Sequence, residues 1–282
     1  MHPRVTISPA LRAWILDTTR AGHGVPDVLR LMKENGYDPR QSRSIVAEVL
    51  KLPLAALTAA THPAQGLRTT VPQAPHVVVD GRAIAVTAGT DKPVVRVLEG
   101  ILDAGECEAL IASARPRLQR ALTVDSQGVQ QVDRRRTSEG MFFDAAETPL
   151  VAAIEQRLEQ LLQLPASHGE GLQILHYLPG QAYEPHYDWF DPAQPGYDAI
   201  TAQGGQRIAS VVMYLNTPEE GGGTAFPEIG LTVTARRGSA VYFAYEGGDR
   251  SSLHAGLPVA RGEKWIATKW LRERPFSPLR CG

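Results

Sequence analysis

The sequence has very little cysteine and no long apolar run. Two cysteines, Cys107 and Cys281, occur in 282 residues, too few for the disulfide network that stabilises small secreted domains. No stretch reaches the roughly 18 apolar residues that a membrane-spanning helix needs. The first twenty residues lack both an uninterrupted apolar segment and a cleavage site, so we expect no secretory signal. These absences predict a cytoplasmic protein that does not enter a membrane.

The chain also lacks an excess of charge of either sign. It has 29 Lys and Arg against 30 Asp and Glu, a formal net charge of -1. No broad electrostatic field is therefore available to attract nucleic acid or anionic lipid, and nucleic acid is a disfavoured partner. A hydrophobic fraction of 43% can form a substantial core, and the length suits one large domain plus a smaller one.

Residues 1–55 have the pattern of a small helical region. Helix-start signals stand near residues 9, 26 and 39, where a proline occupies or closely follows each start. The apolar positions then recur at helical spacing. The residues expected to face inward are Leu11, Trp14 and Ile15 in the first helix, Val28, Leu29, Leu31 and Met32 in the second, and Ile45, Val46, Val49 and Leu50 in the third.

Three short helices also resemble a helix-turn-helix. The basic residues are spread along the segment, however, whereas a recognition helix has a concentrated basic face. We therefore expect these helices to pack on the main domain or to mediate a homodimer rather than to bind DNA. Residues 56–76, rich in Ala, Thr, Pro and Gln without a period, are predicted to be a linker, and residues 77–282 the main domain.

The main domain begins with a hairpin and helices and ends in strands. A two-residue turn at Asp80-Gly81 predicts the hairpin, and helical periodicity predicts helices over 103–120 and 149–162. After Leu164, short apolar segments alternate with turn residues such as Pro179-Gly180. Many short strands at this spacing predict a β-sandwich or jelly-roll rather than a parallel α/β sheet.

His186 and Asp188 form the strongest local chemical signal. In a strand, residues i and i+2 point to the same face, so this pair can hold one metal ion. The site needs a third ligand, and His254 is a candidate because a jelly-roll brings distant strands together. Two histidines and one carboxylate leave three positions open on iron, as non-haem Fe(II) oxygenases require. Taken alone, these residues leave open that the pair is incidental and that His254 is a surface or capping histidine.

The surrounding sequence is more specific. Its segments LQILHYLPGQAYEPHYDWF, VVMYLNTPEEGGGTAFPEIGLTV, GSAVYFAY and HAGLPVARGEKWIATKWLRER closely resemble the catalytic domain of prolyl 4-hydroxylases. That family comprises Fe(II)- and 2-oxoglutarate-dependent dioxygenases, typified by the collagen prolyl 4-hydroxylase alpha subunit. Upstream, PVVRVLEGILDAGECEALIASARPRLQRALTV matches the family's lead-in. The resemblance covers roughly residues 93–275, and it implies an α+β fold with a double-stranded β-helix (jelly-roll) core and flanking helices.

The resemblance implies roles for individual residues. His186, Asp188 and His254 match the iron-binding triad. Lys264, ten residues after His254, matches the basic residue that binds the distal carboxylate of 2-oxoglutarate. A carboxylate buried in such a pocket needs a cationic partner to offset its desolvation. A solvated strand lysine is the alternative for Lys264, but the neighbouring Trp265 indicates a buried strand.

Three further residues are predicted to bind the co-substrate. Tyr177 matches a family position whose hydroxyl reaches the same carboxylate. Tyr214 is a second tyrosine candidate, for which core packing is the alternative. Thr268 lies four residues after Lys264 on the same strand face, so we expect it to line the pocket. Substrate binding is assigned to Arg134 and Arg136, in a region that contributes to it in the family, with a solvated basic turn as the alternative.

The activity that the resemblance implies is hydroxylation of an unactivated C–H bond, foremost at C4 of proline in a peptide or protein. The implied cofactors are Fe2+, 2-oxoglutarate and O2, with ascorbate as a reductant, and the products include succinate and CO2. One alternative is a free amino-acid or small-molecule hydroxylase on the same fold. Another is a non-oxygenase jelly-roll metal-binding protein, which would have no need of a buried Lys264.

Overall fold

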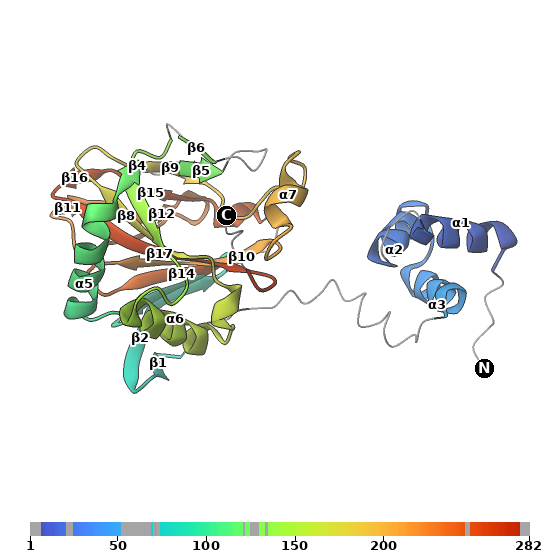
Figure 1. Cartoon of the computed structure of the whole chain (residues 1–282), viewed down its shortest axis with the longest axis horizontal. Coiled ribbons are helices and arrows are strands. Elements are labelled where there is room, and N and C mark those ends of the chain that lie inside the picture. The colour runs from blue at the N-terminus through green and yellow to red at the C-terminus, as the bar shows by residue number, and fades with distance from the viewer. Residues whose placement is uncertain are drawn as a thin grey trace. The chain divides into compact units, whose positions relative to one another are not determined.

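The computed structural model describes residues 7–20, 25–51, 69, 71, 74–120, 122–124, 130–132, 135–245 and 249–276. The chain divides into two compact units, Met1–Gly66 and Leu67–Gly282, which are described separately (Figure 1). The division falls inside the predicted linker. Thr69 and Val71 are buried in the second unit, where the Tyr242 hydroxyl donates to the Thr69 carbonyl at 2.7 Å. The packed part of the second unit therefore starts upstream of residue 77.

The first unit contains the three predicted helices, α1 (Pro9–Arg20), α2 (Val25–Glu34) and α3 (Pro39–Leu50). Their shared core is Ile15, Val28, Met32, Ile45, Val46, Ala47 and Val49. Trp14 was predicted to face inward, but it is 37% exposed. Neighbouring helical residues are about 100° apart, so when Ile15 points into the core, Trp14 lies at the edge of the apolar stripe.

The second unit is built on a large antiparallel sheet. In the part of the chain that is described, its strands run in the spatial order β1 (His76–Val79), β2 (Arg82–Asp91), β3 (Val94–Glu99), β14 (Ala240–Ala244), β10 (Arg207–Tyr214), β17 (Lys264–Arg272), β8 (Leu172–Tyr177), β7 (Glu139–Phe143) and β4 (Gln119–Arg120). A smaller sheet has the order β13 (Leu231–Val233), β12 (Thr224–Phe226), β15 (His254–Gly256) and β9 (Tyr183–His186). Two-stranded pairs join β11 (Glu220–Gly221) to β16 (Val259–Arg261) and β5 (Leu122–Val124) to β6 (Gln130–Val132).

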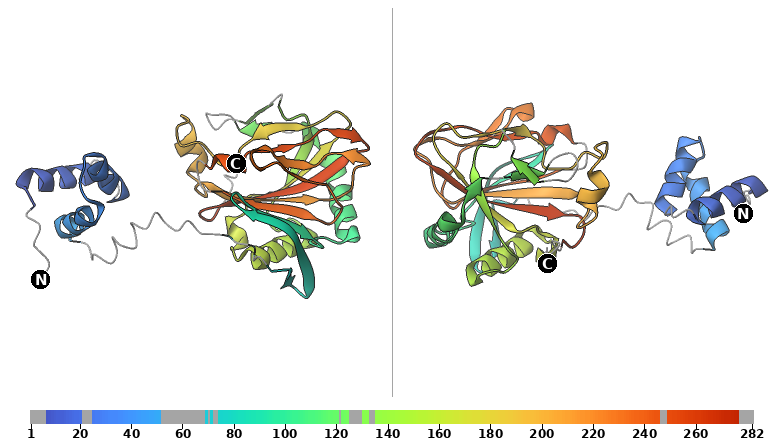
Figure 2. Two further views of the ribbon diagram at one scale, coloured as in Figure 1. Left: turned by 180° about the vertical axis from the view of Figure 1, so that it is seen from behind. Right: turned by 45° about the horizontal axis from the view of Figure 1, so that its top comes forward.

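Helices cover one face of the large sheet and the smaller sheet covers the other (Figures 1 and 2). Alternation along β10 shows why: Val211 and Met213 pack with the helices α5 (Ala104–Ala114) and α6 (Pro149–Leu162). Val212 and Tyr214 instead pack with residues of the smaller sheet. A strand buried on both faces is thus shared by two cores. The predicted α+β jelly-roll with flanking helices is confirmed.

Local signals placed several element ends. Asp80 and Gly81 have φ of 51° and 71°, as a two-residue type I′ hairpin turn requires. Helix α5 begins with a reciprocal capping box between Asp103 and Glu106. The helix predicted over 103–120 is shorter, because Pro116 has no N–H to continue the α-helical hydrogen bonds, and a 3-10 turn (Arg115–Arg117) follows. Within the described residues, no helix is long and apolar enough to span a membrane.

The other short elements connect the sheets. Helix α7 (Tyr197–Thr201) lies in the segment between β9 and β10, in residues that the sequence marked as turn-rich. The remaining 3-10 turns are η2 (Ala166–His168), η3 (Pro227–Ile229) and η4 (Arg250–Ser252). Turn η4 ends two residues before β15 begins, so the turn lies next to the smaller sheet.

Candidate metal and co-substrate site

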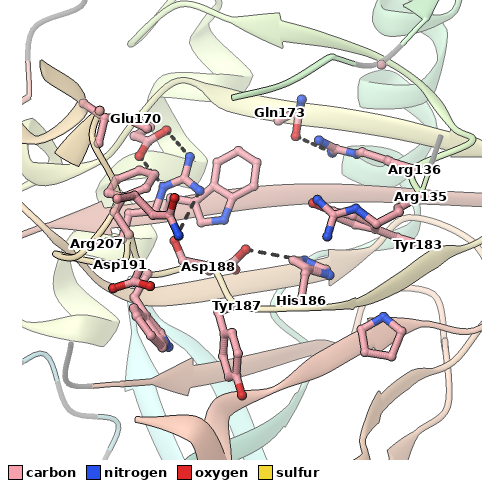
Figure 3. Close-up of a pocket in the computed structure, with 18 of the residues that line it drawn as sticks. Arg135, Arg136, Glu170, Gln173, Tyr183, His186, Tyr187, Asp188, Asp191 and Arg207 are labelled. Carbon is pink, nitrogen blue, oxygen red and sulfur yellow. Dashed lines mark hydrogen bonds and ion pairs between the residues drawn. The ribbon is translucent and has the colours of Figure 1, made fainter. Parts of the chain in front are cut away.

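The smaller sheet brings the two candidate histidines together. Strands β9 and β15 pair antiparallel with His254 opposite His186, and the ring centroids are 4.3 Å apart. Strand β9 ends at His186, and Asp188 lies in a bend two residues later. The predicted single strand through both residues is therefore wrong. The bend still directs the Asp188 carboxylate toward His186, as Figure 3 shows.

The donor atoms of this cluster converge on one point. His186 Nε2 lies 3.6 Å from Asp188 Oδ1, and His254 Nε2 lies 3.6 Å from Asp188 Oδ2. One potential ligand atom from each of the three residues lies within 4.8 Å of the others. This spacing lets one small cation contact all three side chains.

Backbone carbonyls fix the orientation of both imidazoles. His186 Nδ1 is 2.8 Å from the Glu184 carbonyl oxygen, and His254 Nδ1 is 3.1 Å from the Ser252 carbonyl oxygen. Because a carbonyl oxygen can only accept, each Nδ1 carries the proton and each Nε2 presents its lone pair. Metal-binding histidines are typically oriented by such a hydrogen bond from the other ring nitrogen. The residues present therefore fit a divalent metal ion.

The charge states also suit a metal. Burial, with the nearby His186, lowers the pKa of His254 to about 4. Burial by itself would raise the pKa of Asp188, but His254, His186 and Arg207 hold it well below its usual range. At neutral pH these two side chains are thus a neutral imidazole and a carboxylate, the forms that coordinate metal without first losing a proton.

Side chains behind Asp188 hold its carboxylate in place. The Ser210 hydroxyl donates to Asp188 Oδ2 at 2.6 Å, and Tyr245 Oη lies 3.0 Å from Ser210 Oγ. Nearby, the Arg207 guanidinium donates to both carboxylate oxygens of Glu170, at 2.7 and 2.8 Å. The sequence analysis did not identify any of these supporting residues. Ser210, a small polar residue inside an apolar strand, was the one available signal.

Lys264 lies at the start of β17, beside Tyr177 on the neighbouring strand. Its side chain is buried, with 2% exposure, and Nζ lies 5.3 Å from the centroid of the Tyr177 ring. Burial lowers the pKa of Lys264 to about 8. Within the described residues, no carboxylate forms an ion pair with it. A buried ammonium group without an anion is costly, so the site fits a ligand that brings a carboxylate.

A narrow cavity joins Lys264 to the metal-binding cluster. Tyr177 and Thr268, both predicted to bind co-substrate, line it together with Thr224 and Gly256. Tyr214 lies behind this wall, where its hydroxyl donates to Thr224 Oγ1 at 2.7 Å. The centroid of its ring also lies 5.9 Å from Lys264 Nζ, so Tyr214 supports two residues of the cavity wall. Thr224 was missed by the sequence analysis because no pattern distinguishes it.

A larger cavity of about 1160 Å³ opens on the other side of His186 and Asp188. Arg136 lines both cavities. It is buried, it donates to the Gln173 side-chain oxygen at 2.7 Å, and its guanidinium lies 5.1 Å from the Tyr183 ring centroid. Figure 3 shows Arg136 and His186 on the same side of this cavity. Arg134, predicted with Arg136 to bind substrate, lies outside the described residues.

Comparisons with known proteins place this site in a family. The profile of the "2OG-Fe(II) oxygenase superfamily" matches residues 172–272, which include the metal-binding cluster and Lys264. "Probable prolyl 4-hydroxylase 3" of Arabidopsis thaliana is 39% identical over 204 residues, covering 64% of this chain and 69% of that protein. "Prolyl 4-hydroxylase 1" of the same plant is 40% identical over 206 residues, covering 66% and 71%.

A solved structure agrees with these relatives. The viral collagen prolyl hydroxylase of Paramecium Bursaria Chlorella virus-1, crystallised with 2-oxoglutarate, is 29% identical with a TM-score of 0.50. The match covers 63% of this chain and 95% of that one. Sequence profile, relatives and fold all agree, and this chain belongs to the prolyl 4-hydroxylase family of Fe(II)- and 2-oxoglutarate-dependent dioxygenases.

Proposed function

We propose that this dioxygenase hydroxylates proline at C4 within peptides or proteins, with release of succinate and CO2. The observation that carries the proposal is one narrow cavity with a two-histidine, one-carboxylate cluster at one end and the buried Lys264 at the other. A jelly-roll metal protein without oxygenase activity would gain nothing from that lysine. The names of the relatives support proline as the substrate residue.

The three side chains of the cluster would hold the iron. His186 and His254 would bind through Nε2 and Asp188 through its carboxylate, which leaves three coordination positions for co-substrate and oxygen. Iron and 2-oxoglutarate, when bound, supply the oxidising power that converts a C–H bond of the substrate into an alcohol. The chain orients the ligands, through two backbone carbonyls and Ser210. We also propose ascorbate as an external reductant that keeps the iron in its Fe(II) state.

The narrow cavity would hold 2-oxoglutarate. Lys264 would form an ion pair with the distal carboxylate, and the nearby Tyr177, Thr268 and Thr224 offer hydroxyl groups along the wall. Because this wall is buried, water is excluded and the ion pair is stronger than it would be in solvent. Tyr214 would act indirectly, because its hydrogen bond holds the Thr224 hydroxyl.

The larger cavity suits a peptide better than a single amino acid. Its volume of about 1160 Å³ exceeds what a free proline needs, and it is lined by the aromatic side chains of Tyr187, Trp189 and Phe190. Proline-containing segments are extended, and they commonly dock in aromatic-lined grooves. Arginines in the same wall favour a second candidate, a free amino-acid or small-molecule hydroxylase, since a guanidinium could bind a free carboxylate.

Peptides with blocked termini separate the two candidates. We expect capped proline peptides, incubated with enzyme, Fe(II) and 2-oxoglutarate, to gain 16 mass units, roughly one oxygen atom, with release of succinate. His254→Ala serves as the control, because it retains the cavity but lacks one proposed iron ligand. If capped peptides are inert while free proline or lysine gains the same mass, the peptide assignment is wrong.

A further inference from the structure

Among the described residues, the wall of the larger cavity carries more positive than negative side chains. Six described arginines line it, namely Arg117, Arg120, Arg135, Arg136, Arg207 and Arg250. The carboxylates in the same wall are Glu170, Asp188 and Asp191. The chain as a whole has a formal net charge of -1, so this local excess of arginine is not a property of the overall composition. A cavity of this charge would attract an anionic substrate segment.

The carboxylates of the wall already have partners. Glu170 accepts two hydrogen bonds from Arg207 and forms an ion pair with Arg272 at 2.9 Å. Asp188 belongs to the metal-binding cluster. Asp191 accepts a hydrogen bond from the backbone N–H of Ala193 at 2.9 Å, a neutral group that leaves the carboxylate charge in the wall. Among the arginines of the wall, Arg207 pairs with Glu170 at 2.7 Å and Arg117 pairs with Glu147 at 2.6 Å.

Arg120 and Arg250 approach the cavity from different elements, strand β4 and turn η4. The guanidinium of Arg120, on strand β4, donates to the backbone carbonyls of Thr137 and Arg136 at 3.1 and 3.3 Å. Because carbonyl oxygens are neutral, these hydrogen bonds do not cancel the positive charge of Arg120. Arg250 begins turn η4, four residues before His254 in the smaller sheet. Within the described part of the chain, its exposed guanidinium has no hydrogen bond or ion pair.

Arg250 is therefore the cation best placed to select a substrate. It lines the larger cavity and is close in the chain to a proposed iron ligand, and no described residue competes for its guanidinium. A carboxylate near the reacting proline would gain a charge-assisted hydrogen bond there. If the substrate carried a lysine in place of that carboxylate, the arginines of the wall would repel it.

We propose that the enzyme prefers peptides with Asp or Glu within a few residues of the target proline, and that Arg250 is a specificity-determining contact for that carboxylate. The inference rests on the proposed peptide hydroxylation and adds the charge of the substrate to it. Because Arg250 is exposed, the contact is screened by salt, and it acts mainly on KM and on the rate of encounter.

The test uses three capped proline peptides that differ at one flanking position, which holds Glu, Gln or Lys. We expect kcat/KM to fall in the order Glu, Gln, Lys, with the Glu peptide about threefold to fivefold better than the Gln peptide at low salt. In Arg250→Gln this Glu-to-Gln ratio should approach one, and Arg250→Glu should favour the Lys peptide. The preference should weaken as salt is added.

Arg236→Gln is the matched control. Arg236 is 67% exposed, pairs with Glu99 and does not line the cavity, so its loss should leave the Glu-to-Gln ratio of the wild type unchanged. Equal kcat/KM for the three peptides would overturn the charge preference while leaving peptide hydroxylation in place. A ratio that survives Arg250→Gln would overturn the role of Arg250. If none of the capped peptides reacts, the proposed function fails as well.

Discussion

Lys264 and Lys269 lie on the same strand, β17, and each is 2% exposed, but they face opposite sides of the large sheet. Lys269 points toward helix α6, where it forms a buried ion pair with Glu155. Lys264 points toward the smaller sheet, where it meets tyrosine rings and no carboxylate among the described residues. On the helix side the chain neutralises its own buried charge. On the other side, the charge of Lys264 is available to a ligand. Lys269 therefore has a structural role, and Lys264 is suited to binding.

The strongest way to test this comparison is to remove the charge of Lys264. In Lys264→Met we expect the Kd for 2-oxoglutarate to rise by two to four decades, because an unpaired buried carboxylate costs about 3–5 kcal/mol. The folded protein should become more stable by about 3 kcal/mol, since the depressed pKa of Lys264 reflects a buried cation without a partner. Titration of 2-oxoglutarate and chemical denaturation measure the two effects. Unchanged 2-oxoglutarate affinity would show that another cation binds the carboxylate.

Lys269→Met should have the opposite effect on stability. It leaves the Glu155 carboxylate buried beside its other partner, the Ala146 backbone N–H, and should lower the free energy of unfolding by about 3–5 kcal/mol. The double variant Lys269→Met/Glu155→Leu should recover most of this loss. The 2-oxoglutarate affinity of folded Lys269→Met should match that of the wild type. A decade of change in that affinity would mean that the two sides of β17 are not separable.

The pH dependence follows from the same contrast. The pKa of Lys264 is lowered to about 8 in the folded protein, against 10.5 for an ordinary lysine. Between these values the unfolded chain binds more protons, so stability should rise with pH from about 8 to about 10.5. The 2-oxoglutarate affinity should fall about tenfold per pH unit above 8, because the cation is lost. The free energy of unfolding can be measured against pH in Lys264→Met and in Lys269→Met. Only Lys264→Met should lose the rise in stability between about pH 8 and pH 10.5.

The smallest effect concerns the start of the second unit. A chain that begins at Leu67 should retain 2-oxoglutarate turnover, because every residue of the candidate site lies downstream. A chain that begins at Val77 loses the buried Thr69, with its hydrogen bonds to Leu162 and Tyr242, and should unfold at a free energy lower by about 1–3 kcal/mol. Denaturation of the two truncated chains compares them. Equal stability of the two chains would show that residues 67–76 behave as part of the linker and do not stabilise the second unit.

The sequence predicted those parts of the molecule that depend on local order and spacing. The jelly-roll class, the hairpin at Asp80-Gly81 and the three N-terminal helices follow from turn chemistry and periodicity. His186, Asp188, His254 and Lys264 were identified together through the family resemblance. Spacing alone could not show that His254 pairs with His186, because that contact depends on which distant strands are neighbours.

The parts that the sequence missed depend on tertiary contacts between ordinary residues. Ser210 supports Asp188 only because β10 passes behind the bend that follows β9. Thr224 enters the cavity wall from a separate strand and accepts a hydrogen bond from the predicted Tyr214. Glu170 and Arg207 are 37 residues apart in the chain, and no pattern links them. In each case the side chain is unremarkable and its position in the fold gives it a role.

One cavity is expected to bind both a metal ion, at the histidine cluster, and 2-oxoglutarate, between that ion and Lys264. The most direct measurement is anaerobic titration of 2-oxoglutarate into the wild type and Asp188→Ala, each with and without Fe(II). We expect tight binding only in the wild type with Fe(II), because Asp188 supplies the one carboxylate ligand of the cluster. Equal 2-oxoglutarate affinity in the two proteins, or in the wild type with and without Fe(II), would contradict the account.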